Sequence, residues 1–303
     1  MPTVLFACLR GSDMVAQWTK VGIIAGGGAL PLRLIQACEE GGKAWHLIRL
    51  EGYTDHYLAD LRGDDCGIAA PGKVISILKE NSCDAVVMAG IVRRPDFSRL
   101  RPDWRGVSLL PKVVAAARQG DGALLNVLVE TFEREGFNVL GAEDVASPLK
   151  APFGPLGAYA PTDGDLCDIK KASQLVEAIG PFDVGQGAVV RNGFVLAVEA
   201  AEGTDAMLKR CAALPDEVKG FDPGEATRPR GVLLKRPKPD QERRVDLPTI
   251  GVETIKGAVA AGLAGVAVEG EGALIIDRAA VIAEADAAGL FVYGARREDL
   301  SVS

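Results

Sequence analysis

The residues best suited to catalysis lie in the segment 234–251, where basic and acidic side chains alternate. Within it, the acid Asp246 stands between the apolar residues Val245 and Leu247. Cations can bind the phosphates of a diphosphate, but they have no acceptor atom that could hold a metal ion or orient a water molecule. A carboxylate can do both, so the segment predicts diphosphate hydrolysis with Asp246 as a catalytic and metal-binding acid. A solvated charged loop is the alternative. The cations of the segment are Lys235, Arg236, Lys238, Arg243 and Arg244. Of these, Lys235 is a predicted substrate contact.

A second group of acids follows a strand expected at 193–199 and opens a helix expected at 204–212. Acids at a strand end can hold a metal ion or polarise a substrate, so Glu199 and Asp205 are predicted to be catalytic. Asp205 is also a predicted metal ligand with Asp246, and helix capping is its alternative role. Since the chain has only two histidines, carboxylate oxygens should hold the metal, which favours Mg²⁺ or another divalent cation such as Mn²⁺.

Three consecutive glycines, Gly26, Gly27 and Gly28, follow an apolar strand expected at 21–25. Backbone N–H groups at such a strand-to-helix turn can bind a phosphate, and we predict substrate contact there. The dinucleotide-binding fingerprint is incomplete, because Pro31 stands where its last glycine is needed. A tight turn without a ligand is the alternative.

Further basic residues are predicted to contact an anion. Lys73 begins a helix after a near-match to the P-loop motif. However, Val74 replaces the Ser or Thr that would hold Mg²⁺, and no clear strand precedes Gly67. ATP hydrolysis is therefore rejected. Arg93 and Arg94 follow a strand and can clamp an anion with their forked donors at the carboxyl edge of a sheet. A solvated lysine and a surface arginine pair are the alternatives.

Alternating strands and helices must position these residues in the first half of the chain. Near-continuous apolar strands between helices indicate a parallel α/β sheet, and we predict an N-terminal Rossmann-like domain. Asp121, at the start of the last of these helices, is a predicted substrate contact, with an N-cap as its alternative role. Strands are expected at 21–25, 45–50, 85–89 and 137–140, and helices at 32–38, from 72, at 108–118 and at 121–135.

A proline- and glycine-rich stretch, 147–165, is expected to link this domain (20–146) to a second, smaller α/β domain (166–303) that carries the catalytic residues. Residues 1–19 are expected to be an N-terminal extension. We also expect domain closure, and an apolar groove between the domains lined by Phe153, Leu156 and Tyr159. Helices are expected at 167–179, 204–212, 252–261 and 278–288, and strands at 187–190, 193–199, 231–234, 265–268, 273–276 and 290–293.

Composition excludes several classes of protein. With 48% hydrophobic residues the 303-residue chain can bury a core, so it is not intrinsically disordered. The net charge of −7 and only 16 aromatic residues (3 Trp, 4 Tyr, 9 Phe) argue against nucleic acid as a partner. No apolar run is long enough to cross a membrane, and the short run Val4–Leu9 lacks the preceding basic residue of a signal peptide. Six cysteines without C-x-x-C spacing fit a reducing cytoplasm.

Seven motifs, taken together and in order, resemble a known family. They are GIIAGGGALP (22–31), MAGIVRRPD (88–96), GDGALL (120–125), DVGQG (183–187), EAAEGTD (199–205), KRPKP (235–239) and VDLPTIG (245–251). The chain is similar over about residues 20–295 to the UDP-2,3-diacylglucosamine pyrophosphatases of lipid A synthesis called LpxI.

The resemblance implies hydrolysis of the diphosphate of UDP-2,3-diacylglucosamine to UMP and 2,3-diacylglucosamine 1-phosphate (lipid X). It implies a divalent cation, attack of water on the α-phosphorus and Asp246 as a catalytic residue. Gln186 and Thr249, which lie in the matching motifs, are predicted substrate contacts. A nucleotide lipid as substrate places the protein in the cytoplasm, in peripheral contact with the inner membrane, and a homodimer is left open. The alternatives are a non-catalytic nucleotide-sugar sensor and an NAD-dependent oxidoreductase.

Overall fold

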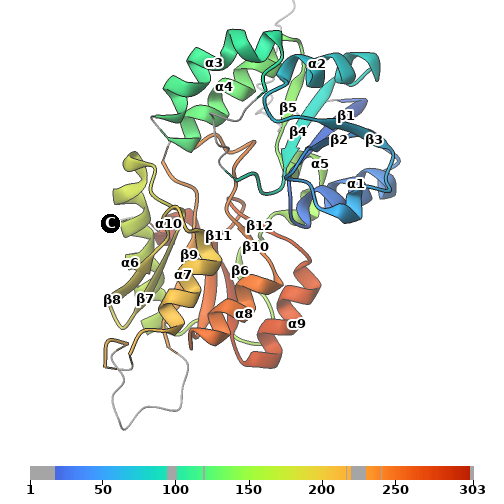
Figure 1. The fold of residues 1–303 in the computed structure, drawn as a ribbon. Helices are drawn as coiled ribbons and strands as arrows, with labels where there is room; N and C mark the ends of the chain where they lie inside the picture. Colours follow the sequence, from blue (N-terminus) through green and yellow to red (C-terminus); the bar gives the residue numbers. More distant parts are fainter. Residues whose placement is uncertain are drawn as a thin grey trace, which may run out of the picture.

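The computed structural model describes residues 18–93, 101–118, 120–215, 217–219, 230–239 and 241–300. It contains two α/β units, one above the other in Figure 1, and each is built around its own sheet. The predicted α/β class, with an N-terminal parallel sheet and a second sheet domain, is confirmed. No helix in those ranges is long and apolar enough to span a membrane.

The N-terminal unit has five strands in the order β3-β2-β1-β4-β5, and every neighbouring pair is parallel. This is the order of a doubly wound sheet, in which the carboxyl ends of the strands share one edge. Its elements are β1 (Lys20–Ala25), α1 (Leu30–Glu40), β2 (Ala44–Leu50), β3 (Gly63–Cys66), α2 (Pro71–Glu80), β4 (Ala85–Ala89), α3 (Trp104–Ala117), α4 (Asp121–Arg134), β5 (Asn138–Leu140) and α5 (Ala142–Val145).

Alternate residues of the central strands face opposite helix layers, as the two-residue period of a strand requires. Ile23 and Val87 pack with residues of α1 and α5, whereas Ile24 and Val86 pack with residues of α2 and α4. Because both faces are covered, the strands are continuously apolar. This is why the sequence predicts strands β1, β2, β4 and β5 to within one residue at each end.

The expectation that no strand precedes Gly67 is wrong, because β3 lies there at the edge of the sheet. Two of its residues are acids paired across to β2: Asp64 with His46 and Asp65 with Arg49, both at 2.8 Å. These cross-strand pairs stabilise the strand in place of the apolar burial by which a strand is recognised in a sequence. The rejection of ATP hydrolysis rests on Val74 alone.

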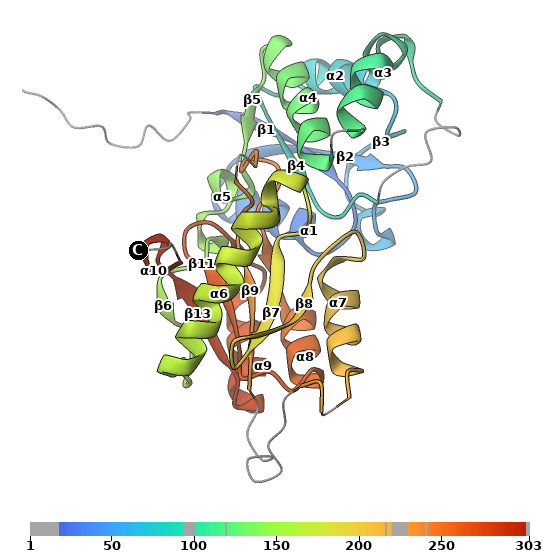
Figure 2. The ribbon, with the colours of Figure 1, turned by 90° about the vertical axis from the view of Figure 1, so that its left-hand side faces the viewer.

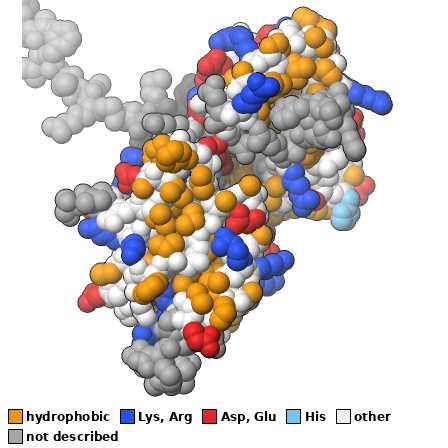
Figure 3. All heavy atoms as spheres, turned by 60° about the vertical axis from the view of Figure 1, so that its left-hand side comes forward, with side chains coloured by type: hydrophobic (Ala, Val, Ile, Leu, Met, Phe, Trp, Pro, Cys, Tyr) orange, Lys and Arg blue, Asp and Glu red, His pale blue; other side chains and the backbone are white. Residues whose placement is uncertain are grey.

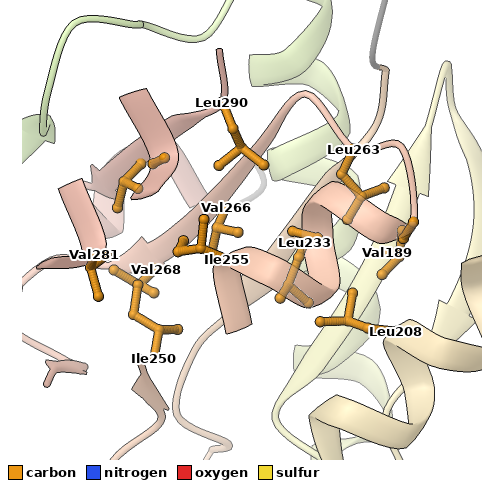
Figure 4. Packing of buried hydrophobic residues seen from close by; sticks show 14 of the residues in the cluster. Val189, Leu208, Leu233, Ile250, Ile255, Leu263, Val266, Val268, Val281 and Leu290 are labelled. Atoms are coloured by element: carbon orange, nitrogen blue, oxygen red, sulfur yellow. The ribbon is translucent and has the colours of Figure 1, made fainter. Parts of the chain in front are cut away.

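The C-terminal unit has a mixed six-stranded sheet in the order β6-β13-β11-β9-β7-β8, in which β9, β11 and β13 are parallel. Figure 2 shows α6 and α7 on opposite sides of this sheet. Figure 4 shows one face of it, where Leu233 and Val266 pack against Leu208 and Ile255 of the covering helices. The elements are β6 (Gly154–Pro155), α6 (Asp163–Ile179), β7 (Gly187–Arg191), β8 (Phe194–Val198), α7 (Gly203–Ala212), β9 (Val232–Lys235), β10 (Thr249–Ile250), α8 (Val252–Ala260), β11 (Gly265–Glu269), β12 (Leu274–Ile275), α9 (Arg278–Ala288), β13 (Phe291–Ala295) and α10 (Arg297–Leu300).

Two expectations about this unit need correction. By strand number it is not the smaller unit, since its sheet has six strands against five over the described ranges. The segment 147–165 is also more than a connection, because β6 pairs with β13 at the sheet edge and Ala151 donates its N–H to the carbonyl of Ala273 at 2.9 Å. Proline is tolerated on an edge strand, so this proline-rich sequence has the composition of a linker and the structure of a sheet edge.

The two units are in direct contact. Leu247 and Leu274 pack into the N-terminal core beside α1 and α5. Arg244 donates to Glu133 of α4 at 2.7 Å, and Arg33 of α1 pairs with Asp277. The segment that carries Asp246 therefore runs from the C-terminal sheet onto the N-terminal unit.

Candidate active site

Strand register brings three predicted site residues to one end of the C-terminal sheet. β7 is antiparallel to both of its neighbours, with Gly187 opposite Lys235 of β9 and Ala188 opposite Val198 of β8. Gln186 therefore lies just before β7, at the end of the sheet where β9 ends at Lys235 and Glu199 follows β8. The parallel strands β9 and β11 end there as well, as expected for a site at the carboxyl edge of a sheet.

Lys235 and Glu199 are buried, with 7% and 9% exposure, and are joined through one hydroxyl. The Lys235 ammonium donates to Thr204 Oγ1 at 2.7 Å, and that hydroxyl donates to Glu199 Oε1 at 2.8 Å. Lys235 also donates to the carbonyl of Thr249 at 3.3 Å. Since Lys235 and Arg236 are both buried, the alternative of a solvated charged loop does not fit the start of this segment.

Asp246 is held by two side-chain amides. Gln186 Nε2 donates to Asp246 Oδ2 at 2.7 Å, and Gln241 Nε2 donates to the same oxygen. Oδ1 accepts no hydrogen bond from the residues that the structure describes. Burial raises the pKa of Asp246, while the Gln186 hydrogen bond and the charges of Lys238 and Lys235 lower it. The arrangement is a fixed carboxylate with one oxygen left for a ligand or a water molecule.

A cavity of about 180 Å³ lies between the two units, and one of its lining residues, Gln241, is hydrogen-bonded to this carboxylate. Gln241 lines the cavity and also bonds Asp246, and Lys238 lines it while pairing with Asp183. Two of the predicted motifs meet here, because Gly120 of the N-terminal unit lies against Asp183 of the C-terminal unit. The lining residues are Gly122, Ala123, Asn126, Gly180, Asp183, Lys238, Pro239 and Gln241.

The glycine turn is bonded within the chain. The N–H of Gly26 donates to the Ala89 carbonyl at 2.8 Å and that of Gly27 to the Ile91 carbonyl at 2.9 Å. The N–H of Gly28 donates to Asp55 Oδ2 at 2.7 Å. In this conformation the three groups offer no donor to a phosphate. The glycines are required by a close approach, since a Cβ on Gly26 would lie 2.7 Å from the Ile91 carbonyl oxygen.

Among the other predicted contacts of the N-terminal unit, the described side chains of Lys73 and Arg93 form no hydrogen bond with Asp246. Lys73 donates its ammonium to the Asp65 carbonyl at 2.7 Å, and its N–H is capped by Asp103 at 2.8 Å. Arg93 is exposed and contacts no charged group in the described ranges, and Arg94 lies outside them. Asp121 is the first residue of α4, with Gly120 as the N-cap, and its side chain lies outside what is described.

Asp205 is not brought to Asp246. It is exposed in the first turn of α7, and it makes no hydrogen bond or ion pair to any described residue. Over the same residues, no group of three or more His, Cys, Asp and Glu is arranged to hold a metal ion. Of the two acids predicted to bind a metal ion, Asp246 is therefore the one that the structure places beside Gln186 and Gln241.

The predicted apolar groove is not seen in the described structure. Leu156 packs into the C-terminal core, and Phe153 and Tyr159 lie against Gly270 and Gly289 of the same unit. None of the three lines the cavity between the units.

Sequence analysis missed Glu269, at the end of β11. It is 2% exposed, accepts a hydrogen bond from Arg243 at 2.8 Å and pairs with Arg236 Nε at 3.4 Å. It thereby ties two parts of the charged segment to the sheet. A charge ending the apolar run 265–268 is the signal that could have identified it.

Comparison with known proteins matches both units to one family. The model described as "LpxI N-terminal domain" matches residues 20–149, and "LpxI C-terminal domain" matches residues 152–293. A curated relative, the UDP-2,3-diacylglucosamine pyrophosphatase LpxI of Caulobacter vibrioides, is 51% identical over 275 residues, which are 91% of this chain and 97% of that protein.

Among solved structures, the biotin carboxylase domain of the Hydrogenobacter thermophilus 2-oxoglutarate carboxylase is 14% identical over 64% of this chain and 41% of that one. Its TM-score of 0.23 is too low to carry any argument. The two family models and the Caulobacter relative agree with the resemblance seen in the motifs, and the chain belongs to the LpxI family.

Proposed function

We propose that this chain hydrolyses the diphosphate of UDP-2,3-diacylglucosamine, giving UMP and 2,3-diacylglucosamine 1-phosphate. The activity of the Caulobacter relative supports the substrate. The observation that carries the proposal is the Asp246 carboxylate, held by two amides beside Lys235 and Lys238 at a cavity between the units. Cations and a fixed acceptor are what cleavage of a diphosphate by water requires.

In the proposed reaction, Asp246 Oδ1 accepts a hydrogen bond from water and orients it towards the α-phosphorus. The water oxygen forms the new bond to phosphorus in UMP while one of its O–H bonds breaks, and that proton passes by way of Asp246 Oδ1 to the solvent. The bond between the α-phosphorus and the bridging oxygen breaks, and that oxygen leaves on the lipid phosphate. The ammonium groups of Lys235 and Lys238 are near enough to lower the pKa of Asp246 and would stabilise the negative charge of the phosphates.

A divalent cation fits this donor set with Asp246 as its protein ligand. Mg²⁺ is commonly held by one or two carboxylates together with substrate phosphate oxygens and water, so a single acid meets the requirement. Asp246 Oδ1, which no described residue occupies, is the oxygen that would bind it. When bound, the ion would neutralise phosphate charge and polarise the phosphoryl group.

Turnover of the detergent-dispersed substrate by the purified chain, with and without Mg²⁺, tests the proposal. In heavy-oxygen water the label should appear in UMP. Asp246→Asn should keep substrate binding and lose at least ~10³ in kcat, the scale of removing one preorganised group. Asp60→Asn, at an exposed acid of the N-terminal unit, is the matched control.

Two results would contradict the proposal. Label in the lipid phosphate would show attack on the other phosphorus. Turnover by Asp246→Asn within about tenfold of the unmodified chain, roughly 1.4 kcal/mol of barrier, would remove Asp246 from the reaction. Asp205→Asn then shows whether the exposed acid of α7 is the catalytic one.

A further inference from the structure

Helix α3 is the most apolar surface helix of the N-terminal unit, yet the residues that it buries are only Gly106, Ala116 and Ala117. Ten of the fourteen residues of Trp104–Ala117 are apolar, and none is acidic. None of the four clusters of buried hydrophobic residues includes an α3 side chain. A helix whose large apolar side chains stay outside these clusters has a face that nothing in the described chain covers.

The exposed residues of α3 and its C-cap recur at spacings of three and four, so they form one face of the helix. Trp104 is 75% exposed and Val107 58% exposed. Figure 3 shows hydrophobic side chains with Lys and Arg beside them at the top of the molecule, where Figure 1 places α3 and α4. The exposed face consists of Trp104, Val107, Ser108, Pro111, Lys112, Ala115 and Arg118.

The face also belongs to a basic segment of an acidic protein. Residues 93–118 contain seven Lys and Arg against two Asp, in a chain whose net charge is −7. Arg101, Lys112 and Arg118 are exposed and form no ion pair with a described residue. Arg105 lies over the Trp104 ring at 5.3 Å and pairs with Glu135.

We infer that the α3 face docks on the surface of an anionic phospholipid bilayer. An exposed Trp beside aliphatic residues suits the boundary between head groups and acyl chains, and cations that no described residue pairs with suit anionic head groups. The inference deepens the proposed function, which requires a lipid substrate. α3 packs against α4, and the first turn of α4 lines the cavity through Gly122 and Ala123. Docking therefore places the cavity one helix away from the lipid.

Vesicle flotation without substrate tests this. The chain should float with vesicles of phosphatidylcholine mixed with phosphatidylglycerol, but not with phosphatidylcholine alone, and high salt should release it. Trp104→Ala with Val107→Ser, and separately Lys112→Glu with Arg118→Glu, should each weaken binding at least about tenfold. Both pairs should keep the unmodified turnover of detergent-dispersed substrate, so failure of docking and failure of the proposed function are distinguishable.

Matched controls lie on the other unit. Phe194→Ala removes an exposed aromatic side chain of β8. Lys209→Glu with Lys256→Glu reverses the charge of two exposed cations, one on α7 and one on α8. Neither control variant should change flotation. Equal flotation of the α3 variants and the unmodified chain would overturn the inference. A second pair of results would also overturn it: the unmodified chain does not bind vesicles, and size exclusion shows a dimer that the α3 variants lose. The face would then bind a second copy of the chain.

Discussion

Gln186 donates its side-chain amide to Asp246 Oδ2 at 2.7 Å, although the two residues are 60 positions apart in the chain. Gln186 immediately precedes β7, whose pairing with β8 and β9 fixes its place at the sheet end. Asp246 lies in the segment that crosses to the N-terminal unit. The hydrogen bond therefore sets the catalytic carboxylate of the proposed reaction relative to the sheet, and Gln186 is a positioning residue.

Gln186→Ala removes a hydrogen bond that favours the ionised form of Asp246, so the pKa of Asp246 should rise further. The acid limb of kcat/KM should then move to higher pH, and kcat should fall about tenfold, the scale of one hydrogen bond to a charged group. A pH–rate profile measures both effects. Gln36→Ala, at a glutamine that bonds Arg33 in α1, should leave the profile unchanged. A fall in kcat with no shift of the acid limb would contradict the role.

Asp246→Asn should be more stable than the unmodified chain at about pH 8. Burial raises the pKa of Asp246 in the folded state above its ordinary value of 3.8, so the folded state binds the proton more readily than the unfolded state. Stability therefore falls as pH rises from that value through the raised pKa, and above it the folded state bears the full cost of a buried carboxylate. Asn has no such charge. Urea unfolding over a series of pH values should show a gain at pH 8 that shrinks as the solution is acidified through the raised pKa towards 3.8, and a gain that does not change with pH would contradict it.

How far sequence alone predicts this molecule depends on where each residue is buried. Strands β1 and β4 are apolar runs because both faces are covered, so their positions follow from the sequence. β3 has two acids paired across to β2, and β6 is a proline-containing edge, so neither has a strand signature. An apolar run is a local property of the sequence, whereas the pairing of a strand at a sheet edge depends on residues far along the chain.

The same distinction holds at the site. Asp246 is identifiable because an acid between apolar residues is unusual in a basic segment. The place of Gln186 and the buried position of Glu269 follow from strand register that no local pattern contains, whereas Gln241 bonds Asp246 within the same loop. Asp205 has the residue type expected of a catalytic acid, yet its place on α7 leaves its side chain exposed. Residue type identified the candidates, and tertiary structure separated them.

Glu269→Ala should destabilise the chain by about 3–5 kcal/mol, the cost of breaking a buried ion pair. It would leave Arg236, which is buried and also donates to Ser173 at 2.6 Å, without its buried partner. Denaturant unfolding measures the change. Glu253→Ala breaks an exposed pair with Lys256 in α8, which the solvent screens, and should cost much less. Losses of equal size in the two variants would show that the Glu269 cluster contributes no more than a surface ion pair.

Gly120→Ala tests whether the contact between the two units shapes the cavity. A Cβ on Gly120 would lie 2.1 Å from Asp183 Oδ2, so the carboxylate that pairs with Lys238 must move. Gly120 has φ +137°, so an alanine there is also strained.

Gly136 separates the two effects, because its φ is +91° and a Cβ there would meet nothing within 4 Å. Gly136→Ala should lose about 1 kcal/mol of stability and keep its kinetics. Gly120→Ala should in addition raise KM for the nucleotide lipid by about tenfold, since a cation lining the cavity loses its fixed position. Steady-state kinetics of both variants, compared at temperatures where each is folded, measure this. Matching KM values for Gly120→Ala, Gly136→Ala and the unmodified chain would show that the cavity between the two units does not bind the substrate.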